Sequence, residues 1–321
     1  MKSLFKAAAP AAAILAALAG GPAVPAGAQT AAADYCGAPL VSARAAAFNL
    51  NLSTAVPAEE GYRLLETGSA ARVDQLELLL KPFSRREEKL IKRMRRRPPY
   101  LVTRVKFDKL RSILSGGALL SPSRAWLGGV LKEKPFTPPI EDSLFGGHSC
   151  VFSSYGPYAG RERYGEVIFR LDLRRLEKRT WGSRASGWHF LESVRDVDPA
   201  SRDSVLPDEI AAFADTVFAG RDLPRVFPLM TVAFLRARTA AERDRLYAEL
   251  TRLEDGPAFY ALIDSERLGY LEVKTDSAIP LSAAGDIEVP PGKLREVLSW
   301  PESRPWRGRI APAADWSSRL N

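Results

Sequence analysis

The spacing of apolar positions changes several times along the chain, and each change predicts a different kind of element. Between residues 59 and 80, leucine and valine recur three or four positions apart, which predicts a helix interrupted near Gly68. Ser84 and Glu87 then form a capping-box pattern, and a proline pair ends the helix predicted over 84–96. The first ordered part of the chain is therefore predicted to be helical.

From residue 100 onward, short runs of alternating apolar and polar residues replace the helical spacing. Such runs are typical of strands. Strands are predicted at 100–106, 150–154, 165–173, 259–263, 268–274 and 286–289. Asp108 begins a short helix that a glycine pair at 116–117 ends. Residues 180–202 show no regular spacing, so we predict irregular structure there.

Residues 207–253 separate the two strand-rich blocks. Their spacing predicts three helices, the last of which begins with a Thr239–Glu242 capping box. Strand-rich blocks on either side of a helical segment favour an α+β fold over a doubly wound parallel sheet.

The N-terminus has the three parts of a secretory signal. Lys2 and Lys6 precede an Ala/Leu-rich stretch that contains Pro10, and the Ala26–Ala28 triplet gives a small-residue cleavage pattern. The apolar run is shorter than the roughly 20 residues that cross a bilayer. We therefore predict cleavage and a secreted or periplasmic protein without a stable membrane span, with an uncleaved anchor as the alternative.

Cys36 and Cys150 are the only cysteines, and 114 positions separate them. In an oxidising compartment such an even pair predicts one disulfide, with two buried thiols as the alternative. In the chain-entropy model, closing so long a loop stabilises the fold by about 4–5 kcal/mol.

The chain carries a formal net charge of +8, to which the signal contributes two lysines. This excess favours anionic partners, such as a membrane surface, a polyanion or a phosphorylated ligand. The densest positive run, Lys92–Arg97, is either a nucleic-acid arm or a set of cations that complement a helix dipole. Because no aromatic residue interleaves with these cations to stack on bases, we favour the dipole and expect no nucleic-acid partner.

Several kinds of site lack their motifs. The two histidines, His148 and His189, belong to no H-E-x-x-H pattern, and two cysteines cannot build a zinc site, so we expect no metal. The sequence contains no P-loop, no G-x-S-x-G elbow and no G-x-G-x-x-G fingerprint. A hydrolase that uses Ser153 and His148 is a weaker alternative.

Three segments place polar residues at the ends of predicted strands. They read LVTR…LSGGALL over 101–120, VFSSYGPYA over 151–159, and GDIEVPPGKL over 285–294. Their order resembles the ADP-ribosyltransferase toxin superfamily: a strand, a helix and a Gly-Gly turn, then a strand that ends in serine, then a glutamate beside V-P-P-G. The last segment is the most specific of the three.

The resemblance implies an α+β fold with a mixed-strand ADP-ribosyltransferase-like core and NAD as the substrate. Glu288 would stabilise the oxocarbenium-like cation that forms when the nicotinamide–ribose bond breaks. Arg104 would pair with the pyrophosphate, and Ser154 would brace the strand beside the ribose. The residues expected to bind the dinucleotide, with a tyrosine stacked on the nicotinamide, are Thr103, Ser153, Tyr158 and Tyr164.

These expectations divide the chain into a signal at 1–28, a lead-in with helices at 29–98, and an α+β domain at 99–321 with a helical insertion at about 203–255. The leading hypothesis is an exported, toxin-like transferase that moves ADP-ribose from NAD to an unknown acceptor. The alternative is a non-catalytic exported module that binds an envelope component or a protein partner. In that case Glu288 is a solvent-facing strand residue and Arg104 is a surface cation.

Overall fold

The structure is a computed structural model. It describes residues 58–127, 129–130, 150–156, 164–176, 178, 180–184, 215–254, 256–275 and 278–313. The predicted signal, Cys36, His148, Tyr158 and His189 lie outside these ranges. Cys150 is fully buried and disulfide-bonded. Its expected bond to Cys36, the only other cysteine, stays a prediction.

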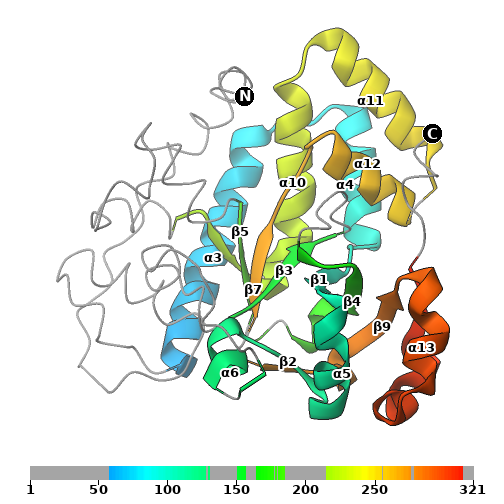
Figure 1. The fold of residues 1–321 in the computed structure, drawn as a ribbon. Helices are drawn as coiled ribbons and strands as arrows, with labels where there is room; N and C mark the ends of the chain where they lie inside the picture. Colours follow the sequence, from blue (N-terminus) through cyan, green and yellow to red (C-terminus); the bar gives the residue numbers. More distant parts are fainter. Residues whose placement is uncertain are drawn as a thin grey trace, which may run out of the picture.

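A helical hairpin opens the described chain (Figure 1). It consists of α3 (Ala58–Leu80) and α4 (Arg85–Arg96), and the predicted capping box at Ser84 and Glu87 is confirmed. The predicted interruption near Gly68 is wrong, because α3 is continuous. One glycine in a helix costs only about 1 kcal/mol, and the next turn of α3 is held by hydrogen bonds to a strand of the sheet.

The centre of the protein is an eight-stranded mixed sheet in the order β10-β9-β4-β1-β3-β7-β5-β6. Its strands are β1 (Leu101–Val105), β3 (Val151–Tyr155), β4 (Val167–Leu171), β5 (Thr180–Ser183), β6 (Val217–Ala219), β7 (Glu272–Thr275), β9 (Ala284–Val289) and β10 (Ile310–Pro312). The β9–β10 pair is parallel, and every other pair in this sheet is antiparallel. Sheet and helices together confirm the α+β class.

Smaller elements lie between the strands of this sheet along the sequence. Helix α5 (Phe107–Gly116) ends at Gly117, whose φ of 65° is left-handed, so the predicted Gly-Gly stop is confirmed. Helix α5 begins one residue before Asp108, and Lys106 occupies the N-cap position without a side-chain hydrogen bond. The elements β2 (Ala118–Leu120) and β8 (Ala278–Pro280) form a two-stranded sheet, and α6 (Pro122–Leu127) follows β2.

Three predictions of element type are wrong. Residues 259–263 were expected to be a strand and lie in α12 (Pro257–Ser265) instead. Residues 180–183 were expected to be irregular and form β5. The described part of the expected helical insertion contains strand β6 as well as two helices. A short apolar run fits a buried strand and a buried helix equally well, so tertiary contacts decide.

The remaining helices follow β6 and β9. They are α10 (Leu223–Arg236), α11 (Ala240–Arg252) and α13 (Leu294–Ser299), and a 3₁₀ segment spans Pro301–Arg309. The capping box predicted for Thr239 and Glu242 at the start of α11 is confirmed.

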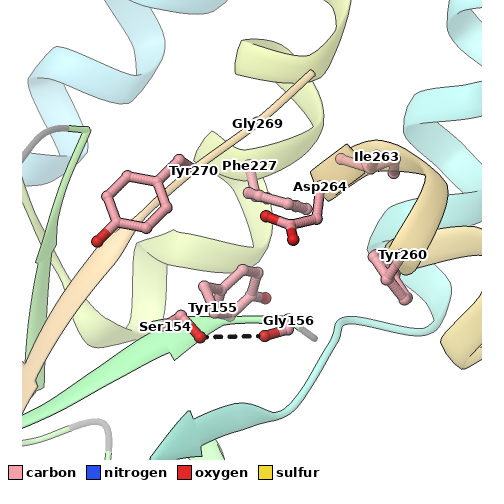
Figure 2. A pocket seen from close by; sticks show the side chains of 9 residues that line it. All are labelled: Ser154, Tyr155, Gly156, Phe227, Tyr260, Ile263, Asp264, Gly269 and Tyr270. Carbon is pink, nitrogen blue, oxygen red and sulfur yellow. Dashed lines mark hydrogen bonds between the residues drawn. The ribbon is translucent and has the colours of Figure 1, made fainter. Parts of the chain in front are cut away.

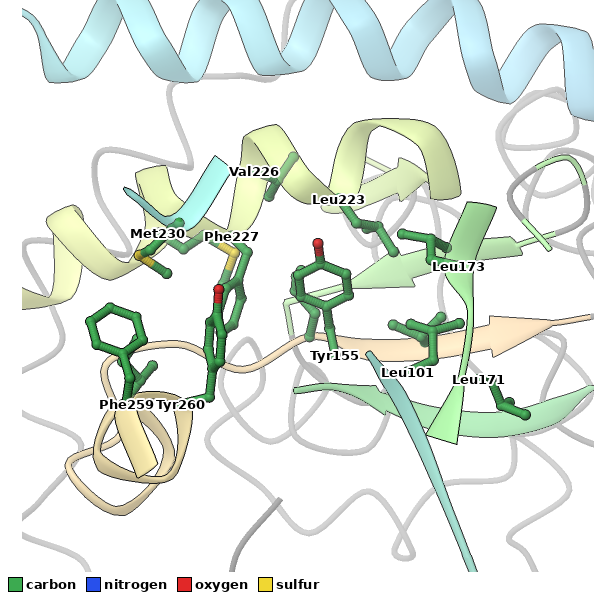
Figure 3. Packing of buried hydrophobic residues seen from close by; sticks show 14 of the residues in the cluster. Leu101, Tyr155, Leu171, Leu173, Leu223, Val226, Phe227, Met230, Phe259 and Tyr260 are labelled. Carbon is green, nitrogen blue, oxygen red and sulfur yellow. The ribbon is translucent and has the colours of Figure 1, made fainter. Parts of the chain in front are cut away.

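The hydrophobic core lies against one face of the sheet, which we call the apolar face. Its strand residues are Leu101, Val151, Tyr155, Val167, Phe169, Leu171, Phe218, Val273, Ile287, Val289 and Ile310. Figure 3 shows Tyr155 beside Phe227 of α10, and their rings meet edge to face with centroids 5.2 Å apart. Helix α10 lies close to the sheet at Gly182, where an added Cβ would lie 2.8 Å from the Leu223 side chain.

Helix α3 is tied to the edge strand β6 by two side chains. Arg72 Nε donates to the carbonyl of Val217 at 3.0 Å, and Ser69 Oγ accepts from the Ala219 amide at 2.9 Å. Ser69 also donates to Asp222 Oδ2 at 2.6 Å. These bonds cross the domain boundary expected at 98, and the core includes residues from both sides of it.

Arg236 joins the helical hairpin to the end of α10. Its guanidinium forms two hydrogen bonds with the Glu87 carboxylate, at 2.6 and 2.8 Å, and donates to the Leu80 and Pro82 carbonyls. Burial, the largest influence, would raise the pKa of Glu87. Hydrogen bonds from Arg236 and Ser84 outweigh it and hold the pKa below its usual value. The Glu87 carboxylate thus stays ionised and links α4 to α10 through Arg236.

Candidate functional site: the polar face of the sheet

The second face of the same sheet carries charged and aromatic side chains, and we call it the polar face. Because successive side chains of a strand point to opposite sides, the paired registers decide which residues share this face. Its members include Arg104, Phe152, Ser154, Ile168, Arg170, Trp181, Ser183, Glu272, Lys274 and Glu288, and the smaller apolar residues Val102, Val217, Ala219 and Ala311 lie on the same face. Neither Ile168 nor Trp181 belongs to the hydrophobic core, although both are buried.

Glu288 is the most constrained carboxylate on the polar face. It is only 6% exposed, and its Oε1 lies 2.5 Å from Nη2 of Arg170 on the neighbouring strand β4. Its Oε2 is buried and has no hydrogen-bond partner in the part of the chain that the structure describes. The carboxylate is thus fixed at one oxygen by a short ion pair while the other oxygen is unsatisfied.

Arg104 shares a cross-strand row with Glu288. Ile168 pairs with Arg104 on one side and with Glu288 on the other. Adjacent strands lie about 4.8 Å apart, so the two backbones are separated by about 10 Å. Of the three residues expected to be catalytic, these two are brought to one face and one row, and Glu288 does not face open solvent.

Ser154, the third expected catalytic residue, also lies on the polar face, opposite Val102 in the register of β1 and β3. Its hydroxyl donates to the Gly156 carbonyl at 3.2 Å and lies 3.5 Å from the Val102 carbonyl. It therefore links the end of β3 to the neighbouring backbone, and its expected position beside a ribose stays a prediction.

The residues expected to bind the dinucleotide do not gather with these three. Thr103 and Ser153 lie on the apolar face, where their hydroxyls are 2.7 Å apart and Thr103 donates to the Phe152 carbonyl at 3.0 Å. The two hydroxyls therefore contact each other on the face opposite Arg104. Tyr164 is exposed and lies three residues before β4, and Tyr158 is outside the described residues.

A second ion pair lies at the β7 side of the polar face. Lys274 Nζ is 3.3 Å from Glu272 Oε1, and it lies over the rings of Trp181 and Phe152 at 4.8 and 5.2 Å from their centroids. Lys274 is only 1% exposed. The indole Nε1 of Trp181 is buried without a hydrogen-bond partner among the described residues. Two aromatic rings and a carboxylate thus hold a buried ammonium.

Arg170, Glu272, Lys274 and Trp181 were absent from the sequence-based site. Arg170 alternates with the apolar residues Phe169 and Leu171 in its strand, which signals an outward polar position but does not show which strand lies beside it. Trp181 belongs to a strand that was predicted to be irregular. The pairings that assemble the polar face join residues that are distant in the sequence, 64 positions apart for Arg104–Ile168 and 93 for Trp181–Lys274, so local spacing does not reveal them.

A small cavity opens beside the end of β3 (Figure 2). It is lined by Ser154, Tyr155, Gly156, Phe227, Tyr260, Ile263, Asp264, Gly269 and Tyr270, and its volume is about 10 Å³. Such a volume holds about one water molecule, far less than a dinucleotide needs. Burial raises the pKa of the Tyr155 hydroxyl well above its usual value, so this group stays protonated.

Two further findings concern the described ranges alone. Within them, no group of three or more His, Cys, Asp or Glu residues is arranged to hold a metal ion. None of their helices combines the length and the apolar character needed to cross a bilayer.

No protein-family model and no curated protein matches the chain. The functional inference that follows therefore depends on the chemistry of the polar face. This face sets three cationic side chains (Arg104, Arg170 and Lys274) beside two carboxylates (Glu272 and Glu288) on neighbouring strands.

Proposed function

We propose that the protein is an exported ADP-ribosyltransferase that uses the polar face to bind NAD and transfers ADP-ribose to an acceptor. The observation that carries the proposal is the Arg104–Glu288 row. It sets a guanidinium and a half-satisfied, buried carboxylate on one face, with one residue between them. The proposal covers NAD as the substrate, the transfer of ADP-ribose and the export of the protein.

The reaction needs a fixed negative charge beside the ribose. The bond between ribose C1′ and the nicotinamide nitrogen breaks, its electron pair stays on the nitrogen, and neutral nicotinamide leaves. The sugar becomes oxocarbenium-like until a nucleophilic acceptor adds to C1′ and loses its proton. A carboxylate that is already oriented stabilises that cation without reorganising during the reaction. Glu288 fits this role because Arg170 holds Oε1, while Oε2 has no hydrogen-bond partner among the described residues.

The cations of the polar face suit the other end of the substrate. A planar guanidinium pairs with phosphate through two hydrogen bonds, and Arg104 lies in the same row as the carboxylate. The electrostatic attraction is strong on such a face, because buried charges are poorly screened. Thr103 and Ser153 have no part in this site, because they lie on the other face.

The test is the release of nicotinamide from NAD, followed by transfer of labelled ADP-ribose to proteins of a cell lysate. Glu288→Gln keeps the size of the side chain and removes its charge, so we expect turnover to fall by about 100-fold or more. Glu296→Gln is the matched control, since this glutamate lies on α13 and is exposed. It should leave turnover unchanged.

Thermal unfolding of both variants separates catalysis from folding. A Glu288→Gln protein that unfolds cooperatively and has lost turnover supports the proposal. A wild-type protein that releases no nicotinamide and labels no lysate protein contradicts it. Full turnover by a folded Glu288→Gln protein also contradicts it.

A further inference from the structure

The positive run of α4 divides into two sets of side chains. Arg93 points into the protein, where it donates to the carbonyls of Leu250 and Leu253 at the end of α11 and lies 4.2 Å from the Phe259 ring centroid. Arg95 pairs with Glu77 of α3 at 3.1 Å. Both arginines connect helices, and Arg93 also complements the negative end of α11.

The other cations form a solvent-facing row that we call the basic stripe. Its members are Arg85, Lys89, Lys92 and Arg96. At 3.6 residues per turn, positions i, i+4, i+7 and i+11 share one side of the helix, and the row is about 16 Å long. Leu90, Ile91 and Met94 occupy the opposite, buried side. All four cations are exposed, and none forms an ion pair or hydrogen bond with a described side chain.

The positive charges of the stripe lack carboxylate partners among the described residues, whereas nearby arginines have them. Neighbouring arginines have carboxylate partners, as Arg86 has Asp244 at 2.9 Å and Arg236 has Glu87. Glu88 flanks the stripe but does not pair with any of its members. Like charges four positions apart on a helix repel by a few tenths of a kcal/mol per pair. An external anion that contacts all four cations would relieve this repulsion.

We propose that the basic stripe binds an anionic lipid surface. A straight row on the convex side of a helix touches a plane along its whole length. Nucleic acid is less suitable, because the stripe has no aromatic side chain to stack on bases. The apolar side of α4 is buried in the core, so the helix cannot insert into a bilayer. The binding is therefore electrostatic and sensitive to salt.

This inference is independent of the proposed transferase. Helix α4 packs against α10 (Figure 1), and α10 covers the apolar face of the sheet. The stripe lies on the side of α4 opposite its buried residues, so it does not adjoin the polar face. A protein bound through the stripe would hold its polar face away from the lipid.

The experiment is flotation of the full chain with vesicles made of equal parts phosphatidylglycerol and phosphatidylcholine. Replacing all four stripe cations by glutamine should lower the bound fraction at least tenfold, because each cation near such a surface contributes about fivefold. About 1 M salt, where the Debye length is about 3 Å, should release the wild-type protein. Vesicles of phosphatidylcholine alone measure the binding that any apolar segment contributes.

A matched variant removes the same number of charges elsewhere. It replaces four exposed cations by glutamine: Lys178, Arg252, Arg295 and Arg304. We expect it to bind like wild type. Equal loss in both variants would show that net charge alone drives binding and would overturn the proposal, as would wild-type binding by the stripe variant or no binding to anionic vesicles at all. If the fourfold stripe variant unfolds, the pair Lys89→Gln and Lys92→Gln should still give an intermediate loss.

Discussion

The two faces of the central sheet are built from the same strands but bury different kinds of side chain. One face buries apolar residues and the other buries ion pairs. On the apolar face, Phe169 and Leu171 are completely buried among other apolar side chains. On the polar face of the same strand β4, Arg170 pairs with Glu288 and is only partly exposed. Phe169 in the core and Arg170 in the ion pair are adjacent residues of the chain.

The difference concerns what each face contributes to stability. Apolar burial stabilises the fold by roughly 25 cal/mol for each Å² removed from water, whichever apolar residue supplies it. Buried ion pairs contribute little net stability, because desolvation offsets the attraction between the charges. The apolar face therefore explains why the sheet folds, and the charges on the polar face call for a functional explanation.

The largest effect is expected on the apolar face. Phe169→Ala leaves a cavity at a fully buried position, and we expect it to lower the free energy of unfolding by about 3–5 kcal/mol. Urea unfolding followed by fluorescence measures this loss. A loss below about 1 kcal/mol would mean that the core on this face is not tightly packed.

A medium effect is expected when one partner of the polar-face ion pair is removed. Glu288→Leu leaves the Arg170 guanidinium without its carboxylate, which should cost about 3 kcal/mol. Replacing Arg170 and Glu288 together by leucine should restore most of that stability and leave the protein without transferase activity. Chemical unfolding of the single and double variants gives the coupling between the two sites. A double variant as unstable as the sum of its singles would show that the two residues act on stability independently and not through their pairing.

The smallest effect is expected from the hydroxyl pair on the apolar face. Thr103→Val leaves the Ser153 hydroxyl without its partner and should cost about 1–2 kcal/mol. Adding Ser153→Ala should recover part of this loss, because both polar groups are then gone. Thermal unfolding measures the stability, and NAD turnover should stay at the wild-type level because the pair lies across the sheet from Glu288. Reduced turnover in a stable double variant would place these hydroxyls at the site after all.

The sequence predicted those elements whose first or last residue depends on a few neighbouring residues. The Ser84–Glu87 and Thr239–Glu242 boxes start α4 and α11, and Gly117 ends α5. Strands β1, β3 and β9 also lie where the alternation of apolar and polar residues predicted them. Each of these signals depends on backbone conformation within one or two turns of chain.

The parts that escaped prediction depend on contacts between distant segments. Residues 259–263 form a helix because Phe259 and Tyr260 pack on α4 and α10, where Arg93 lies over the Phe259 ring. Strand β5 has only four residues and becomes a strand by pairing with β6 and β7. The role of Arg170 follows from the register of β4 and β9, which no local pattern specifies. The structure places Arg104, Ser154 and Glu288 on one face of the sheet, whereas Thr103 and Ser153 lie on the other face.

The contacts between α3 and β6 have a consequence for the behaviour of the protein in solution. Strand β6 is the last strand of its sheet, and such a strand offers its peptide groups to any extended chain it meets. Arg72 and Ser69 bind the Val217 carbonyl and the Ala219 amide, so part of this border is occupied from within the molecule. Helix α3 thereby leaves fewer of the β6 peptide groups open to another chain, and it also adds Val73, Leu76 and Leu80 to the core.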